Sequence, residues 1–145
     1  MADRRPAPLV GRLVVVGLGL IGGSFAKGLR QQGLCREVVG VDLDAESRRL
    51  AVQLGVVDRC ESELAAACVG ADAIMLAVPI IAMEKVLAQL ATFELGDAVI
   101  TDVGSAKGNV VRAARAAFGP RVARFVPGHP IAGAEKSGVE AANGR

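Results

Sequence analysis

Three glycines near the N-terminus have the spacing of a phosphate-binding turn. Gly17, Gly19 and Gly22 form the pattern G-x-G-x-x-G directly after the β-branched run 13–16. In such a turn the first glycine permits a tight bend, and the second lets the backbone approach a pyrophosphate. The third lets the following helix, whose first N–H groups are free for phosphate, pack close to the sheet. We predict dinucleotide binding by Gly17, Leu18, Gly19, Leu20, Ile21 and Gly22. The alternative is a structural strand-to-helix turn without a ligand.

An acidic residue stands at the end of the next predicted strand, 37–41. Asp42 lies 20 residues after Gly22, where a dinucleotide fold places the carboxylate that binds the adenosine ribose. A carboxylate repels a 2′-phosphate, so Asp42 favours NAD, while the neighbouring Arg48 and Arg49 keep NADP as the less favoured alternative. Alternatively, Asp42 binds no ligand and serves as a turn or cap residue before the next helix.

Two residues late in the chain could move or position a proton. His129 is the single histidine of the sequence and lies in a loop bracketed by glycine and proline. An imidazole with a pKa of about 6.5 can accept a proton from an alcohol while hydride leaves for a nicotinamide. Ser105 opens a predicted helix, where a serine is an N-cap by default, and capping is compatible with substrate contact. Asp102 could be catalytic or structural.

Predicted strands alternate with predicted helices along the whole chain. The strands are 13–16, 37–41, 56–57, 71–78, 97–103 and 122–126. The first predicted helix has Ile21, Phe25 and Leu29 on its core face, and two further helices are predicted at 46–54 and 61–69. A fourth helix has a core stripe of Ile80, Met83, Leu87 and Leu90, and a fifth has one of Val110, Ala114, Ala117 and Phe118. This alternation predicts an α/β fold of Rossmann type. We expect a doubly wound parallel sheet with strand order 3-2-1-4-5-6 and right-handed crossovers.

The candidate residues converge on one edge of that sheet. Ligands of open α/β sheets bind outside the carboxyl ends of the strands. The glycine turn, Asp42, Ser105 and His129 each follow a predicted strand. Val78 and Pro79 follow another, so we add both to the cofactor-binding residues.

Length and composition bound the class of protein. The 145 residues suit one domain; we expect a disordered tail over 1–10 and an NAD(P)-binding domain over 11–145. The hydrophobic content of 52% and mean hydropathy of +0.42 fit a sheet buried on both faces. No apolar run reaches the roughly 18 residues of a membrane span, and no signal peptide is evident. A net charge of +2 without Trp or Tyr gives no basis for nucleic-acid binding.

The cysteines do not indicate a metal site. Cys35, Cys60 and Cys68 are odd in number and lack metal-ligand spacing, and only one histidine could join them. We expect reduced thiols in a cytoplasmic protein.

Several segments together resemble the N-terminal domain of prephenate/arogenate dehydrogenases, the oxidative enzymes of tyrosine biosynthesis. The segments are VGLGLIGGS (16–24), VD (41–42), AVP (77–79), DVGSAK (102–107) and GHPIAGAEKSG (128–138). The last two are more specific than the glycine motif, which many dehydrogenases share. The resemblance extends over residues 13–140.

The resemblance implies NAD-dependent oxidative decarboxylation. Hydride passes from C4 of prephenate or arogenate to C4 of the nicotinamide, and the ring carboxylate leaves as CO2. His129 matches the family histidine that takes the proton of the substrate 4-hydroxyl. Ser105 matches a serine near that histidine, the hydroxyl and the nicotinamide, so we count it among the cofactor-binding residues as well. Glu135 matches an acid near the mouth of the site, and Asp42 matches the NAD-selecting acid.

The family continues into a helical C-terminal domain that supplies dimer contacts and cationic groups for the substrate carboxylates. This sequence stops at residue 145, so we expect a cofactor-binding part that is poorly active alone, and a homodimer for the full-length enzyme. One alternative is the cofactor domain of a β-hydroxyacid-type dehydrogenase, a class that lacks the histidine loop 128–130. The other is a non-catalytic nucleotide-binding module.

Overall fold

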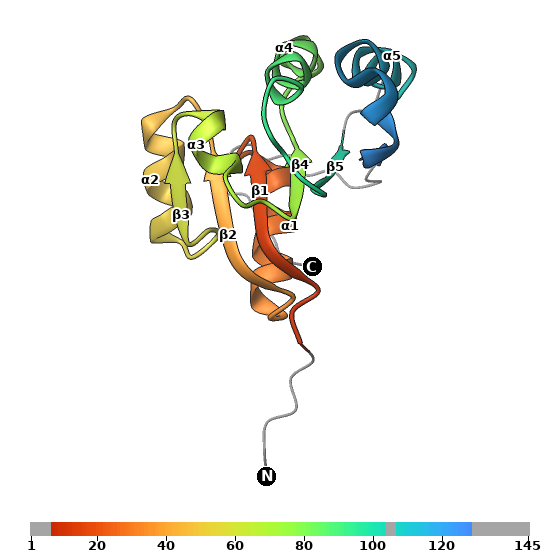
Figure 1. Cartoon of the computed structure of the whole chain (residues 1–145). Coiled ribbons are helices and arrows are strands. Elements are labelled where there is room, and N and C mark those ends of the chain that lie inside the picture. Colours follow the sequence, from red (N-terminus) through yellow and green to blue (C-terminus); the bar gives the residue numbers. More distant parts are fainter. Residues whose placement is uncertain (1–6, 104–106, 129–145) are drawn as a thin grey trace.

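The computed structural model describes residues 7–103 and 107–128 and shows a parallel sheet of six strands (Figure 1). The strand order is β3-β2-β1-β4-β5-β6, and every neighbouring pair is parallel. The elements are β1 (Val10–Val16), α1 (Leu20–Gln31), β2 (Cys35–Val41), α2 (Ala45–Gln53), β3 (Arg59–Glu61), α3 (Leu64–Cys68), β4 (Ala73–Leu76), α4 (Ile80–Leu90), β5 (Val99–Asp102), α5 (Lys107–Phe118), a 3-10 helix η1 (Gly119–Arg124) and β6 (Phe125–Val126). The predicted fold class and strand order are confirmed.

Two apolar layers cover the two faces of the sheet. Val14 and Val16 of β1 pack with residues of α3, α4 and α5, which cover one face. Leu13 and Val15 point the other way and pack with Ala26 of α1 and with α2. In Figure 1, α4 and α5 lie side by side over their face. Burial on both faces explains why the strands are continuous apolar runs. None of the helices in the described ranges is long and apolar enough to cross a membrane.

Helix α1 packs on the sheet through small residues, which corrects the predicted core face. Gly22 and Ala26 are buried, whereas Phe25 is 38% exposed and Ile21 is half-buried. Leu29 does pack against the core, as predicted. The prediction placed Phe25 inside because Ile21, Phe25 and Leu29 are spaced at i, i+4 and i+8. The helix instead approaches the strands closely at Gly22, where an added Cβ would lie 2.9 Å from the Cβ of Ala77.

The third strand is displaced from its predicted position. Val56 and Val57 are both 1% exposed, but their N–H groups donate to the carbonyl of Ala51 at 2.9 and 3.3 Å. They therefore close the C-terminus of α2. The third strand is instead β3, whose three residues all pair with β2. Helix α3 consequently begins at Leu64 and not at the predicted Glu61.

The last strand is also shorter than predicted. Residues 122–124 belong to η1, which begins at Gly119 (φ +55°). Only Phe125 and Val126 pair with β5.

In α4, Met83, Leu87 and Leu90 are buried as predicted, but Ile80 in the first turn is 40% exposed.

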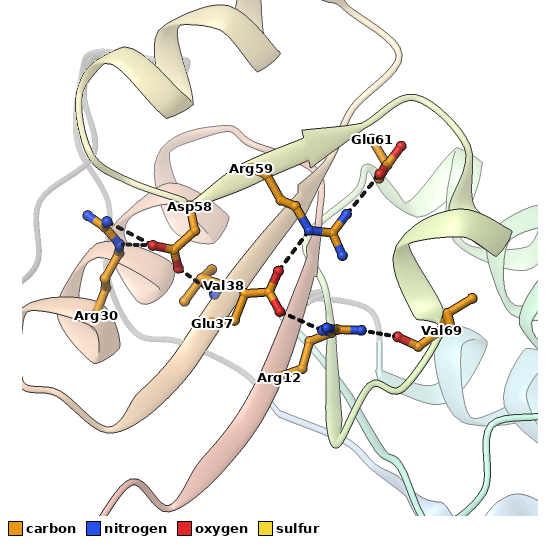
Figure 2. Close-up of polar contacts among 8 residues, drawn as sticks. All are labelled: Arg12, Arg30, Glu37, Val38, Asp58, Arg59, Glu61 and Val69. Carbon is orange, nitrogen blue, oxygen red and sulfur yellow. Dashed lines mark hydrogen bonds and ion pairs between the residues drawn. The ribbon is translucent and has the colours of Figure 1, made fainter.

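A ladder of ion pairs joins the first three strands (Figure 2). Glu37 of β2 accepts hydrogen bonds from Arg12 of β1 and Arg59 of β3, both at 2.7 Å. Arg59 also pairs with Glu61 at 2.8 Å, and Arg12 also donates to the carbonyl of Val69. The hydrogen bonds from Arg59 and Arg12 hold the pKa of Glu37 below its ordinary value.

Candidate functional site

The turn between β1 and α1 requires glycine at its first position. Gly17 has a φ of +94°, and its N–H donates to the carbonyl of Val41 at 2.8 Å. A Cβ on Gly17 would lie 2.5 Å from the carbonyl oxygen of Ala77. Both the backbone conformation and the close approach of β4 therefore exclude a side chain.

Gly22 is fixed by packing. A Cβ on Gly22 would overlap the carbonyl oxygen of Gly17 and would lie 2.9 Å from the Cβ of Ala77. The absence of a side chain therefore lets α1 approach the sheet, which is the packing role predicted for the third glycine of the motif.

Gly19 differs from the other two, because no described part of the protein needs a glycine there. It is the N-cap of α1 with φ −81° and ψ −162°, and no side chain caps the helix at this position. A Cβ added to Gly19 would meet no atom of residues 7–103 or 107–128 within 4 Å. The space beside Gly19 is open, at a helix end whose N–H groups suit an anion. A group approaching from outside would explain the glycine.

Asp42 links the end of β2 to the glycine turn. Its Oδ2 accepts a hydrogen bond from the N–H of Leu18 at 3.0 Å, and its Oδ1 accepts one from the N–H of Asp44 at 2.9 Å. A carboxylate offers about four lone-pair sites, so it can accept further bonds from sugar hydroxyls. The predicted cap or turn role and the predicted ribose role are thus compatible at Asp42.

The two arginines that follow are engaged with the protein itself. Arg48 donates through Nη1 to the carbonyls of Asp42 and Leu43 at 2.7 and 3.0 Å. Arg49 donates from Nε to the carboxylate of Glu46 at 2.9 Å, on the same helix. These contacts leave the carboxylate of Asp42 as the group that the loop after β2 presents beside the glycine turn.

A cavity of about 660 Å³ opens at the carboxyl ends of β1, β2 and β4. It brings together four predicted residues: Gly17, Asp42, Val78 and Pro79. Leu18 is buried, and its backbone N–H donates to Asp42. Positions 19–22 belong to the N-terminal end of α1 and do not line the cavity. The cavity is large enough for a nucleoside-sized group.

Other cavity residues were not found from the sequence. Leu43 lines the cavity and is 92% exposed, and Glu63, Lys85 and Gln89 also line it. The sequence could have indicated Leu43, because this apolar residue directly follows Asp42 at the edge of the sheet where ligands bind. The other three come from α4 and from the residue before α3, and no spacing pattern marks them.

Ser105, His129 and Glu135 lie outside the described residues. The described ranges end at Val103, two positions before Ser105, and at Gly128, directly before His129. Asp102, three positions before Ser105, accepts a hydrogen bond from the N–H of Gly128 at 3.2 Å. The last described residues before Ser105 and before His129 thus follow adjacent strands, β5 and β6, of the same sheet.

The described residues offer no metal centre. No group of three or more His, Cys, Asp and Glu side chains within these ranges could hold a metal ion. Cys35, Cys60 and Cys68 are free thiols, as predicted, and burial raises the pKa of Cys68 to about 11.

A parallel sheet of order 3-2-1-4-5-6, with a glycine turn and a strand-end acid at one edge, defines a nucleotide-binding domain of Rossmann type. The sequence profile of the family "Prephenate dehydrogenase, nucleotide-binding domain" matches residues 25–145, so the chain belongs to this family. That match begins after the glycine turn and includes the segments around Ser105 and His129.

Individual relatives agree with the family. The prephenate dehydrogenase of Lactococcus lactis subsp. cremoris is 41% identical over 133 residues, covering 91% of this chain and 37% of the relative. The crystal structure of Aquifex aeolicus prephenate dehydrogenase in complex with hydroxyphenyl propionate and NAD+ superposes with a TM-score of 0.83 at 38% identity, covering 92% of this chain and 46% of that one. For Synechocystis arogenate dehydrogenase the TM-score is 0.80 at 32% identity, with 91% and 45% covered. The chain therefore spans less than half the length of these proteins.

Proposed function

We propose that this chain is the NAD-binding part of a dehydrogenase of tyrosine biosynthesis that oxidatively decarboxylates prephenate or arogenate. The observation that carries the cofactor assignment is the hydrogen bond between Leu18 and Asp42. It holds the acid at the end of β2 against the glycine turn, beside a cavity of about 660 Å³. The names of the relatives support the substrate class, since two are prephenate dehydrogenases and one is an arogenate dehydrogenase.

Three features of the chain suit NAD. The N-terminal end of α1 and the open space at Gly19 would hold the pyrophosphate. Asp42 would accept hydrogen bonds from the ribose hydroxyls and would repel a 2′-phosphate. Because Arg48 and Arg49 are bonded within the protein, NADP is the less favoured cofactor. NAD, when bound, would supply the acceptor for the hydride.

The roles of the residues outside the described ranges come from the family resemblance. His129 would accept the proton of the substrate 4-hydroxyl, so that a carbonyl can form as the hydride leaves. Ser105 would lie near the imidazole, the substrate hydroxyl and the nicotinamide, and Glu135 would lie near the mouth of the site. Loss of the ring carboxylate as CO2 would then leave the aromatic product.

This chain covers 37% of the Lactococcus lactis relative and 46% of the Aquifex aeolicus chain. As an isolated polypeptide, these 145 residues would therefore bind NAD and turn over prephenate or arogenate poorly. A homodimer is expected of the full-length enzyme.

The cofactor assignment is tested by titrating the 145-residue chain with NADH and following nicotinamide fluorescence. Wild type is expected to bind, and Gly19→Val is expected to lose binding because the new side chain fills the open space beside α1. Binding that survives in the variant would sink the pyrophosphate assignment.

The reaction is tested with the polypeptide expressed from the complete reading frame, by following NADH formation with prephenate and with arogenate. The His129→Asn variant should lose most of its rate and keep its cofactor affinity. An unchanged rate would remove His129 from the mechanism. NADH binding without turnover of either substrate would instead favour a non-catalytic nucleotide-binding module.

A further inference from the structure

Asp102 is the one charged side chain that is buried among the residues the structure describes. It is the last residue of β5 and is 1% exposed. A carboxylate in such a place is costly unless hydrogen-bond donors satisfy it. One donor is the backbone N–H of Gly128, which lies 3.2 Å from Oδ1. The buried carboxylate therefore binds the chain segment that follows β6.

This contact continues the pairing of β5 and β6 beyond the point where the backbone can do so. The last residue pair of the two strands is Thr101 with Val126. The next residue, Pro127, has no N–H and cannot donate to β5. Gly128 is the first residue with a donor after that pair, and its N–H reaches the side chain of Asp102. A side-chain hydrogen bond thus replaces the backbone ladder.

Gly128 is also held by shape. A Cβ on Gly128 would lie 2.7 Å from the carbonyl oxygen of Asp102 and 3.3 Å from Oγ1 of Thr101. The backbone of residue 128 therefore lies directly against the end of β5, and both the contact and the hydrogen bond fix its distance from that strand.

We propose that Asp102 is a positioning residue that holds the segment carrying His129 in register with the segment carrying Ser105. This inference rests on the proposed function of those two residues. Asp102 lies three positions before Ser105, and its partner Gly128 directly precedes His129. One carboxylate at the base of both segments sets where each leaves the sheet. Asp102 acts through these segments and not on the substrate.

The proposal is tested in the 145-residue chain by NMR, because His129 is the single histidine and gives one imidazole signal. Asp102→Ala removes the acceptor and is expected to shift or broaden that signal and the amide signal of Gly128. Asp102→Asn keeps an acceptor oxygen and should restore both signals in large part. Unchanged signals in Asp102→Ala would overturn the proposal.

Two further variants keep the test decisive. Gly128→Ala leaves the carboxylate in place but pushes the segment away from β5, so it should shift the His129 signal even if Asp102→Ala does not fold. Asp97→Ala is the matched control, because Asp97 is an exposed aspartate near the opposite end of β5. It should leave the signal unchanged. An unshifted signal in Gly128→Ala, or a shift as large in Asp97→Ala, would also overturn the proposal.

The complete reading frame supplies a second readout. Asp102→Ala should lower kcat about 10- to 100-fold, the effect of a catalytic group displaced by about 1 Å. NADH affinity should stay within about twofold, since Gly19 and Asp42 belong to other strand ends, and Asp102→Asn should recover much of kcat. A lowered NADH affinity with unchanged kcat would contradict a positioning role. If wild type turned over neither substrate, the proposed function would fail, and the NMR result would still decide the role of Asp102.

Discussion

The Oδ2 atom of Asp42 lies 3.0 Å from the backbone nitrogen of Leu18, and this hydrogen bond makes the strand-end acid and the glycine turn one structural unit. The second carboxylate oxygen accepts from the N–H of Asp44. The side chain is thereby held in one orientation, with its remaining lone pairs available at the cavity. A change at Asp42 should therefore act on the glycine turn as well as on the ribose.

Replacing Asp42 by alanine should weaken NADH binding about 10- to 100-fold. The estimate corresponds to losing hydrogen bonds to a charged acceptor, worth roughly 1.5–3 kcal/mol. NADPH should lose less affinity than NADH, because the repulsion of the 2′-phosphate disappears with the carboxylate. Fluorescence titration of the variant with both nucleotides measures the two affinities.

Asp44→Ala is the matched control for this experiment. Asp44 caps α2 by accepting from the N–H of Ser47 at 2.9 Å, and its replacement should lower stability because that N–H loses its partner. The variant keeps the hydrogen bond from the backbone N–H of residue 44 to Asp42, so its NADH affinity should equal that of wild type. An equal loss of NADH affinity in both variants would contradict a direct role for Asp42.

Two glycines of the turn should separate cofactor binding from stability. Gly22→Ala places a methyl group against the carbonyl of Gly17 and should lower the free energy of unfolding by about 1–3 kcal/mol, as overpacking does. Gly19→Ala meets no atom of the described residues within 4 Å, so it should lower stability by less than about 1 kcal/mol while weakening NADH binding. Chemical unfolding and NADH titration of both variants check the pair. Equal losses of stability would contradict the open space at Gly19.

The arrangement of the fold was predictable because it follows from patterns that every element shares. Apolar strands alternating with helices allow few topologies once crossovers are right-handed, and the sheet has the expected order. The position of Asp42 at the end of β2 was also predictable, because the apolar run before it ends there.

The errors arose where tertiary packing overrides local hydrophobicity. Val56 and Val57 look like a strand, yet their N–H groups bond to Ala51, since the C-terminus of α2 offers an acceptor nearby. Phe25 has the spacing of a core residue, but α1 approaches the sheet through the buried Gly22, Gly23 and Ala26. Phe25 stays 38% exposed. The hydrogen bond between Leu18 and Asp42 also has no sequence pattern, because it depends on the distance between two loops.

Cys68 should be the least reactive of the three thiols. It is 5% exposed, and burial raises its pKa to about 11. The thiolate is the reactive form, so at about pH 8 Cys68 should react with a disulfide reagent only as fast as the protein opens. Cys35 and Cys60 are partly exposed and should react sooner. Cys68→Ala should remove the slow phase, and a single rate for all three native thiols would contradict this assignment.

The ladder across β1, β2 and β3 should make stability depend on pH through Glu37. Its carboxylate accepts from Arg59 and Arg12, so the pKa of Glu37 lies below its ordinary value of 4.5 when folded. A lowered pKa means that the stabilisation is complete above the unfolded value and is lost as the pH falls through the folded one. Glu37→Gln should therefore lower the free energy of unfolding by about 1 kcal/mol near neutral pH. The difference from wild type should shrink below about pH 4.5.

Urea unfolding of wild type and Glu37→Gln at about pH 7 and about pH 3 measures this dependence. Glu46→Gln is the control, because Glu46 pairs with Arg49 on the exposed surface of one helix and joins no strands. Since Glu37 bonds to arginines from both neighbouring strands, its loss should exceed that of Glu46. A difference for Glu37→Gln that stays constant between the two pH values would show that the ionised carboxylate does not hold the three strands together.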